Sequence, residues 1–270
     1  MTRKKKKSAT AFAGPALAGL FLFSAFYPGG AAAYSPAGYP GAVWGGISRG
    51  PGTEGSGTQG WARQGVRWAS FGGKLNLDTY AAYNWRVRTE NKTYYNTYGP
   101  SLIAELGAGP FSFGAEYGWL RYPEQSANIK YFSLFAGWYD TRDISKWTGL
   151  PYLGSHAPLA LPFSSWGKFS YDLQGAEGSG SQGWVKQGVD WFYFGRGLKF
   201  NTYAAYNWRV RTKNKQYYNV HGPSLGAVFS YKYFNLGAEY SRARFTQLGR
   251  TDKTFNIFFN WFYGWNLKRK

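Results

Sequence analysis

The chain has few of the residue types on which protein chemistry usually depends. Its 270 residues include no cysteine, only two histidines and only 13 acidic residues. The absence of cysteine excludes disulfide bonds and thiolate metal sites. His156 and His221 lie far apart, and neither has further ligand-type residues at the spacing of a metal site. We therefore expect no enzyme activity, no metal and no cofactor.

Long hydrophobic runs are also scarce. After the first 33 residues, no stretch is apolar and long enough to form a transmembrane helix. The first residues combine a positive segment, Arg3–Lys7, an apolar segment, Ala9–Phe26, and the small residues Ala31–Ala33. This order is typical of a cleaved signal peptide, and Pro15 disfavours the alternative of an uncleaved inner-membrane anchor. The sequence therefore predicts an exported protein with a signal peptide at residues 1–33.

Aromatic and positive residues, in contrast, are abundant. Aromatic residues make up 21% of the chain, and the net charge is +19. Trp and Tyr favour membrane–water interfaces, so this content suggests interfacial girdles rather than the alternative, an aromatic-rich soluble sandwich. The positive residues are spread along the chain instead of forming a basic arm, which argues against nucleic acid as a partner. For an exported protein, outer-membrane lipids, anionic lipopolysaccharide and acidic polysaccharide are nearer partners.

The sequence repeats itself at an offset of 123 residues. The eleven residues Thr79–Thr89 recur without change as Thr202–Thr212. Within each copy, apolar and polar side chains alternate over segments of about ten residues, the pattern expected of transmembrane β-strands. The same offset relates EGSG at Glu54 and Glu177, GPSL at Gly99 and Gly222, and GAEY at Gly114 and Gly237.

The alternating segments predict an all-β fold, a transmembrane antiparallel up-and-down β-barrel. Up-and-down strands reverse direction each time, so five strands per copy would turn the second copy upside down, whereas six would preserve its orientation. We therefore predict about twelve strands from two tandem repeats, with ten as the alternative. The expected strands are Val43–Ser48, Trp61–Phe71, Lys74–Thr89, Tyr98–Gly107, Pro110–Leu120, Asn128–Tyr139, Trp166–Gln174, Trp184–Phe194, Leu198–Thr212, His221–Ser230, Tyr233–Arg242 and Lys253–Trp265.

The connections indicate how the barrel is oriented. Short turns such as Gly72-Gly73 fall on the side of the termini, which is periplasmic in bacterial barrels, and longer loops such as Glu90–Thr97 fall outside. One long Pro-rich connection interrupts this pattern. The predicted segments are a signal peptide at 1–33, a Gly/Pro-rich lead-in at 34–52, a first barrel repeat at 53–142, a linker at 143–165 and a second barrel repeat at 166–270.

The alternation also predicts which side chains face the lumen. Charges belong inside, because Arg or Lys facing lipid at the middle of the membrane costs about 2–4 kcal/mol. Rings of charge could draw anionic solutes through a channel, or Arg and Glu could pair and fill a narrow interior. Four arginines against two glutamates favour an anion-attracting interior. The predicted lumen-lining residues are Arg86, Arg88, Arg209, Arg211, Glu116, Glu239, Asn84 and Asn207.

The signal peptide, the alternating aromatic strands and the last strand, Phe255–Trp265, resemble bacterial outer-membrane β-barrel proteins over about residues 40–270. The Arg-bearing strands are weakly similar to exopolysaccharide-export porins, although a periplasmic helical-repeat domain is missing. The chain also ends on Lys268-Arg269-Lys270, where an aromatic residue is usual. His221 and Ser224 loosely resemble the site of outer-membrane lipid A deacylases and phospholipases, but no acidic residue lies near in sequence, so a polar turn is the better interpretation.

Two hypotheses of function follow. In the first, the protein is a channel or export pore in the bacterial outer membrane for anionic or sugar-like solutes, including polysaccharide. In the second, it is a closed barrel that acts as an adhesin, structural protein or receptor through its outer loops. The sequence leaves open whether barrels associate with one another or with a secretion machinery.

Overall fold

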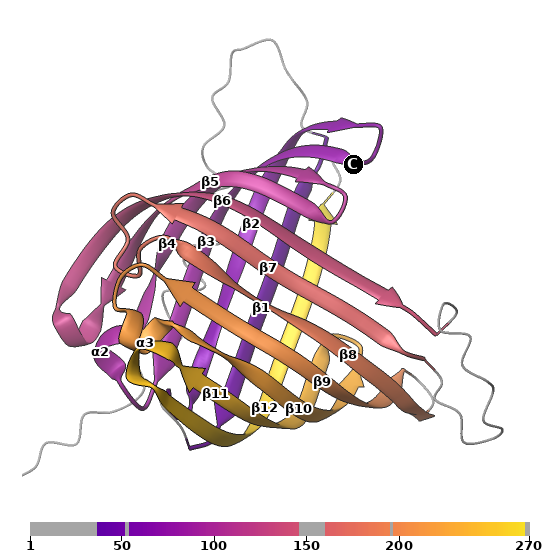
Figure 1. Ribbon diagram of the computed structural model, residues 1–270. Coiled ribbons are helices and arrows are strands. Elements are labelled where there is room, and N and C mark those ends of the chain that lie inside the picture. Colours follow the sequence, from indigo (N-terminus) through magenta and orange to yellow (C-terminus); the bar gives the residue numbers. More distant parts are fainter. Residues whose placement is uncertain (1–36, 52–53, 146–159, 195–196, 268–270) are drawn as a thin grey trace, which may run out of the picture. The chain divides into compact units, whose positions relative to one another are not determined.

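A computed structural model describes residues 37–51, 54–145, 160–194 and 197–267 (Figure 1). The predicted signal peptide and most of the predicted linker lie outside this part of the chain. Among the described residues, no helix is long and apolar enough to cross a membrane. The described strands are β1 (Tyr39–Arg49), β2 (Gly57–Phe71), β3 (Leu75–Arg88), β4 (Thr97–Ala108), β5 (Phe111–Tyr122), β6 (Ala127–Asp143), β7 (Pro162–Asp172), β8 (Gly180–Phe194), β9 (Leu198–Arg211), β10 (Val220–Tyr231), β11 (Phe234–Phe245) and β12 (Arg250–Leu267).

These twelve described strands form one closed antiparallel barrel. Each strand pairs with its neighbours in sequence, and β1 pairs with β12 from Tyr39 opposite Leu267 to Arg49 opposite Ile257. The prediction of twelve strands is confirmed over the alternative of ten. Strands β1 and β7, the first strand of each half, bring the total from ten to twelve.

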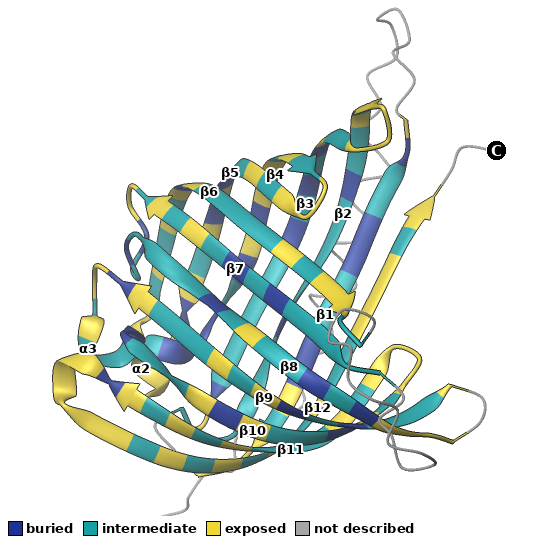
Figure 2. Ribbon diagram, turned by 45° about the vertical axis from the view of Figure 1, so that its right-hand side comes forward, coloured by how far each residue is buried: buried dark blue, intermediate teal, exposed yellow. Residues whose placement is uncertain are grey.

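The barrel has a polar interior and an apolar exterior. Ser101, Ser133 and Ser224 are only 1%, 3% and 2% exposed, whereas Phe113 and Leu225 are 49% and 63% exposed. Figure 2 shows the resulting alternation of buried and exposed residues along the strands. This distribution is the reverse of a soluble protein and is the arrangement of outer-membrane barrels, in which one strand face meets lipid.

The two ends of the barrel differ in their connections. At one end, strands are joined by short turns, such as the one at Gly72 and Gly73, where positive φ angles suit glycine. At the other end, four of the described connections contain short helical turns. Two of these turns, α2 and α3, lie side by side (Figures 1 and 2). The four turns are α2 (Lys92–Tyr95), η2 (Pro123–Gln125), α3 (Lys215–Tyr218) and η4 (Thr246–Leu248). We call this end the mouth.

Tryptophan rings cover glycines at the two seams where the halves of the barrel join. At the seam of β1 and β12, Gly45 lies opposite Trp261, and a Cβ atom at Gly45 would collide with the indole ring. At the seam of β6 and β7, Gly167 lies opposite Trp138 in the same way. An aromatic ring laid over a strand glycine replaces the missing side-chain packing, so both seams close without a gap on the outer wall.

Candidate functional site

Two nearly identical helical turns reach into the mouth of the barrel. Asn91 precedes α2 and Asn214 precedes α3, with φ angles of 45° and 48° in the left-handed region that Asn tolerates. After each turn, an asparagine side chain fixes the loop to its strand. The Oδ1 atom of Asn96 accepts a hydrogen bond from the Arg88 amide at 2.5 Å, and that of Asn219 accepts one from the Arg211 amide at 2.6 Å.

Four tyrosines from these turns meet across the mouth and form what we call the tyrosine bridge, Tyr94, Tyr95, Tyr217 and Tyr218. The Tyr95 hydroxyl donates to the Tyr217 carbonyl at 2.8 Å, and the Tyr218 hydroxyl donates to the Tyr94 carbonyl at 2.6 Å. The rings of Tyr94 and Tyr217 stack with their centroids 3.9 Å apart. Tyr95 and Tyr218 are 0% and 1% exposed.

The strands that precede the two helical turns show that the tyrosine bridge spans the lumen. Strand β3 leads into α2 and β9 leads into α3, and the two strands lie six apart in the twelve-stranded ring. They therefore stand on opposite walls. A contact between their loops crosses the lumen, so the tyrosine bridge obstructs the mouth.

Two glutamates just before β2 and β8 make a second set of contacts across the lumen, which we call the ion-pair bridges. Glu54 lies 3.2 Å from Nε of Arg88 in its own half and 2.6 Å from Nη2 of Arg209 in the other half. Glu177 repeats the arrangement, 3.0 Å from Nε of Arg211 and 3.3 Å from Nη1 of the opposite arginine, Arg86. Each carboxylate thus ties together two walls.

The charges of the arginines keep both carboxylates ionised. Burial alone would raise the pKa of Glu54, but the neighbouring charges of Arg209, Arg88 and Arg86 outweigh it and lower this pKa to about 2. The pKa of Glu177 is lowered for the same reason. Burial, together with the charge of Glu54, raises the pKa of Tyr95 to about 12, so its hydroxyl keeps the proton that it donates.

The predicted lumen-lining residues all lie on the inner face of the barrel, but some of them form ion pairs with other residues than expected. The arginines pair with Glu54 and Glu177, and not with the predicted partners Glu116 and Glu239. Glu116 pairs instead with Lys168 at 3.2 Å and accepts a hydrogen bond from Tyr131. The remaining predicted residues make neutral contacts: Glu239 with the Tyr203 hydroxyl, Asn84 with Ser101, and Asn207 with Ser224.

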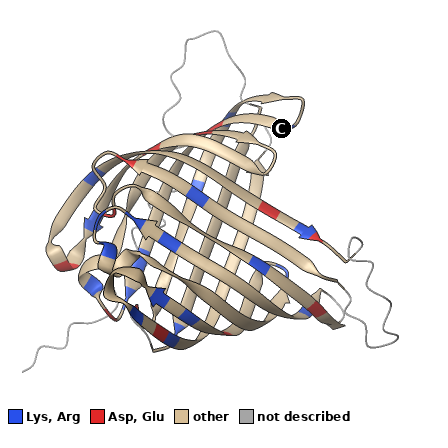
Figure 3. Ribbon diagram, in the orientation of Figure 1, with Lys and Arg blue, Asp and Glu red and all other residues tan. Residues whose placement is uncertain are grey.

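The pairing of the arginines with Glu54 and Glu177 changes the expected charge of the interior. The excess of four arginines over two glutamates disappears once Glu54 and Glu177 are counted at the mouth. The repeated EGSG motif marks both glutamates in the sequence, but their position in a loop gives no indication that they face arginines 155 and 91 residues away in the chain. Figure 3 shows Lys and Arg gathered toward the end that carries α2 and α3.

Deeper in the lumen, cations lie over aromatic rings on the inner wall. The Arg63 guanidinium is 4.3 Å from the Tyr80 ring centroid and 3.6 Å from Glu105. At the equivalent place in the second half, the Lys186 ammonium is 4.7 Å from the Tyr203 ring centroid and 5.3 Å from that of Trp184. Among the described residues, Lys186 has no carboxylate within 4.0 Å and no hydrogen-bond acceptor.

His221 lies on the outer wall and not in the lumen. It stands opposite Trp208 in the β9–β10 register, and its Nδ1 atom is 2.7 Å from the Tyr206 hydroxyl. Tyr206 is 47% exposed on the face that meets lipid. This position separates His221 from Ser224, which is buried on the inner face of the same strand.

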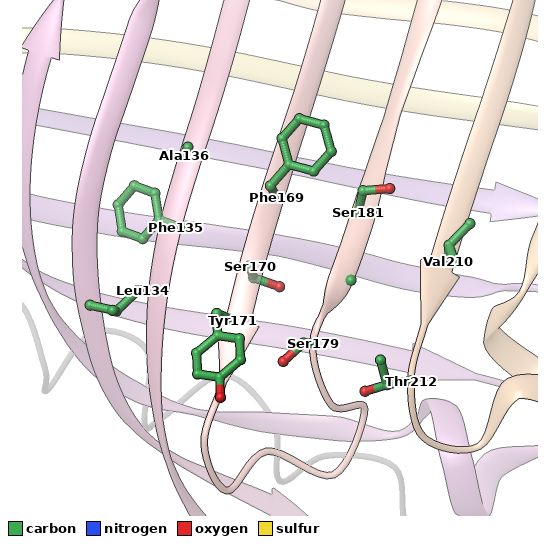
Figure 4. A pocket seen from close by; sticks show the side chains of 11 residues that line it. Leu134, Phe135, Ala136, Phe169, Ser170, Tyr171, Ser179, Ser181, Val210 and Thr212 are labelled. Atoms are coloured by element: carbon green, nitrogen blue, oxygen red, sulfur yellow. The ribbon is translucent and has the colours of Figure 1, made fainter.

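The outer wall also carries a groove of about 520 Å³, which Figure 4 shows from close by. Phe169 and Tyr171 of β7 form one side, and Val210 of β9 forms the other. The small residues Ser179 and Ser181 lie between them. The walls are 47–61% exposed on the outside of the barrel, so the groove faces lipid and is separate from the lumen.

Comparison with known proteins finds structural likeness but no match in sequence. No protein-family model and no curated protein matches the chain. An outer membrane channel from Pseudomonas putida F1 has a TM-score of 0.40 and 10% identity over 88% of this chain and 100% of its own. The KdgM porin in complex with disordered oligogalacturonate has a TM-score of 0.32 and 7% identity over 82% and 98%. CdiB from Acinetobacter baumannii has a TM-score of 0.35 and 11% identity over 83% and 60%. These values are too low to transfer a function.

Proposed function

We propose that the protein is a bacterial outer-membrane channel for anionic or sugar-like solutes, polysaccharide among them, with a mouth that the tyrosine bridge and the ion-pair bridges hold closed. The closed barrel with an apolar exterior supports the membrane location, and the predicted signal peptide supports export. Since short turns lie on the periplasmic side of bacterial barrels, the mouth faces the outside of the cell. We propose no enzymatic step.

The observation that carries the channel proposal is the environment of Lys186. An ammonium group without a carboxylate or acceptor partner is costly to place in a dry protein interior. Lys186 faces the lumen beside the rings of Tyr203 and Trp184, and the Glu239 carboxylate attracts its charge from farther than 4.0 Å. Among the described residues, the N–H donors of its ammonium group have no acceptor. Its charge is therefore best accounted for by water, which favours an aqueous lumen below the mouth over a fully packed core.

The same side chains suggest the chemistry of the solute. A flat aromatic ring presents a face on which a sugar ring can stack, and a cation next to it attracts a carboxylate or phosphate. Both halves offer this combination, with Arg63 beside Tyr80 and Lys186 beside Tyr203. Because the arginines at the mouth are already paired and Arg63 lies 3.6 Å from Glu105, we assign anion attraction to Lys186 rather than to the predicted arginine ring.

Conductance across a planar bilayer tests the proposal. We expect the wild-type protein to pass little current, and Glu54→Gln/Glu177→Gln to increase the current several-fold, because the ion-pair bridges lose their charge. Glu90→Gln removes an exposed carboxylate near the mouth and serves as the matched control, with wild-type current expected. In the open variant, Lys186→Glu should reduce the preference for anions. Folded barrels that insert but pass no current in any variant would reject the channel.

The contacts across the mouth also favour a second candidate, a closed barrel that works as an adhesin, structural protein or receptor through its outer loops. In this case the bridges would shape a rigid binding surface rather than a gate. Removing the α2 and α3 loops would then abolish binding to cells or saccharides, while substitutions of Lys186 would have no effect. The opposite pattern is expected of a channel.

A further inference from the structure

A cluster of cations lies on the lipid-facing wall, where it plays no part in the proposed channel. Arg242 and Arg244 lie on the outer face of β11, and Lys253 lies on the outer face of β12. All three are exposed, and none has a carboxylate within 4.0 Å among the described residues. We call these three residues the outer basic patch.

The register of the two strands makes this arrangement unfavourable in the isolated barrel. Arg242 stands directly opposite Lys253 in the β11–β12 pairing. Like charges directly opposite each other on one face of a sheet are destabilising. The outer basic patch therefore does not stabilise the strands, and an anion outside the protein would relieve its repulsion.

The height of the patch in the wall indicates where that anion lies. One step toward the middle of the barrel on the same face come Tyr240 and Phe255, 45% and 54% exposed, and then the apolar band. Arg or Lys facing lipid costs about 2–4 kcal/mol at mid-membrane but about 0–1 kcal/mol near the interface. The patch thus sits where hydrocarbon gives way to lipid headgroups, at the level of the mouth.

We infer that the outer basic patch binds the phosphate groups of lipopolysaccharide in the outer leaflet. Clusters of Lys and Arg at the headgroup level recognise anionic lipid groups, and two arginines can each bind a phosphate through two N–H donors. The inference rests on the proposed outer-membrane location and orientation. It assigns a lipid partner to the wall, independent of what passes through the lumen.

The first half of the barrel provides an internal comparison. The residues equivalent to the patch are Trp119, Arg121 and Lys130, and Trp119 stands opposite Lys130. The Trp119 ring packs on Tyr117, with centroids 4.6 Å apart. Because an indole replaces one guanidinium, this half has no pair of opposed cations, and we expect the second half to hold phosphate more tightly.

Binding of purified lipid A to the detergent-solubilised full chain tests the inference. The probes are lipid A with its phosphates and the same lipid after enzymatic dephosphorylation, measured by native mass spectrometry. We expect Arg242→Gln/Lys253→Gln to bind the phosphorylated lipid about 10-fold more weakly than the wild type. The control, Lys74→Gln/Lys232→Gln, removes the same charge from turns at the opposite end and should bind like the wild type.

Two further results separate a lipid site from a general anion site. Dephosphorylated lipid A should bind wild type and Arg242→Gln/Lys253→Gln equally, and millimolar inorganic phosphate should not displace the phosphorylated lipid. In detergent without lipid A, the patch variant should be at least as heat-resistant as the wild type, because it loses only repulsion. Equal affinity of wild type and patch variant for phosphorylated lipid A would overturn the inference. Bilayer conductance tests the channel proposal separately, and the patch variant should leave it unchanged.

Discussion

The two halves of the barrel agree at the mouth and differ on the outer wall at the level of the outer basic patch. At the mouth, Tyr95 corresponds to Tyr218 and Glu54 to Glu177, and each pair makes the same contacts in both directions. On the outer wall, the equivalent of Arg242 is Trp119. A reciprocal contact needs the same residue on both sides, as in a twofold interface, whereas each outer wall meets lipid alone. Residues that form contacts between the halves are therefore the same in both halves, whereas residues that meet only lipid can differ.

The largest effect is expected when the chain is cut in half, because it tests whether one half can fold into a barrel alone. Residues 34–142 contain β1 to β5 and all of β6 except its last residue, but leave both edges without partners. Each unsatisfied backbone group in the hydrocarbon region costs several kcal/mol, so we expect no folded monomer in detergent. The measurement is heat-modifiable migration on a gel. A compact half-chain monomer would show that the two halves are independent barrels.

The next effect concerns the two seams. Gly45→Ala and Gly167→Ala each place a methyl group against the indole that covers the glycine, Trp261 or Trp138. Overpacking of this kind costs about 1–3 kcal/mol, and the two seams should be affected equally. Temperature-dependent loss of the heat-modifiable form measures it. Gly107→Ala is the control, because a Cβ atom there meets nothing within 4 Å; a large loss in only one seam would contradict the equivalence of the halves.

A smaller effect concerns the tyrosine bridge. Tyr95→Phe and Tyr218→Phe each remove one hydrogen bond across the mouth, worth about 0.5–1.5 kcal/mol. We expect each single variant to open more often in bilayer recordings, by similar factors. Tyr240→Phe, on the lipid-facing wall, should have no effect. A response to Tyr95→Phe alone would mean that the two turns do not act reciprocally.

The smallest effect is that of pH on conductance, between neutral and moderately acidic pH. An unperturbed glutamate has a pKa of about 4.3, and that of Glu54 is lowered to about 2. A lowered pKa stabilises the closed mouth above the unperturbed value, and the stabilisation is lost as the pH falls through the lowered value. Conductance should therefore stay constant down to about pH 4 and rise only near pH 2 to 3. An increase near pH 5 would indicate that the arginines do not hold Glu54 ionised.

The sequence predicted the wall of the barrel better than its contents. Alternation and the need to keep both copies in one orientation were enough to predict twelve strands, because they depend on local patterns and on strand direction. The helical turns α2 and α3 were missed, since four residues are too few to show a helical period. The pairing of Glu54 with Arg209 could not be predicted, because it depends on how far a loop reaches across a closed barrel. The role of the predicted lumen residues in transport stays a prediction.

The reciprocity of the tyrosine bridge has a consequence for how the mouth moves. The Tyr95 hydroxyl holds the turn that carries Tyr218, and the Tyr218 hydroxyl holds the turn that carries Tyr95. Displacing either turn therefore breaks both hydrogen bonds together, so neither turn can leave while the other keeps its full set of contacts. Such coupling makes opening cooperative, and single-channel recordings should show one full step between closed and open levels, without a half-open level for each turn.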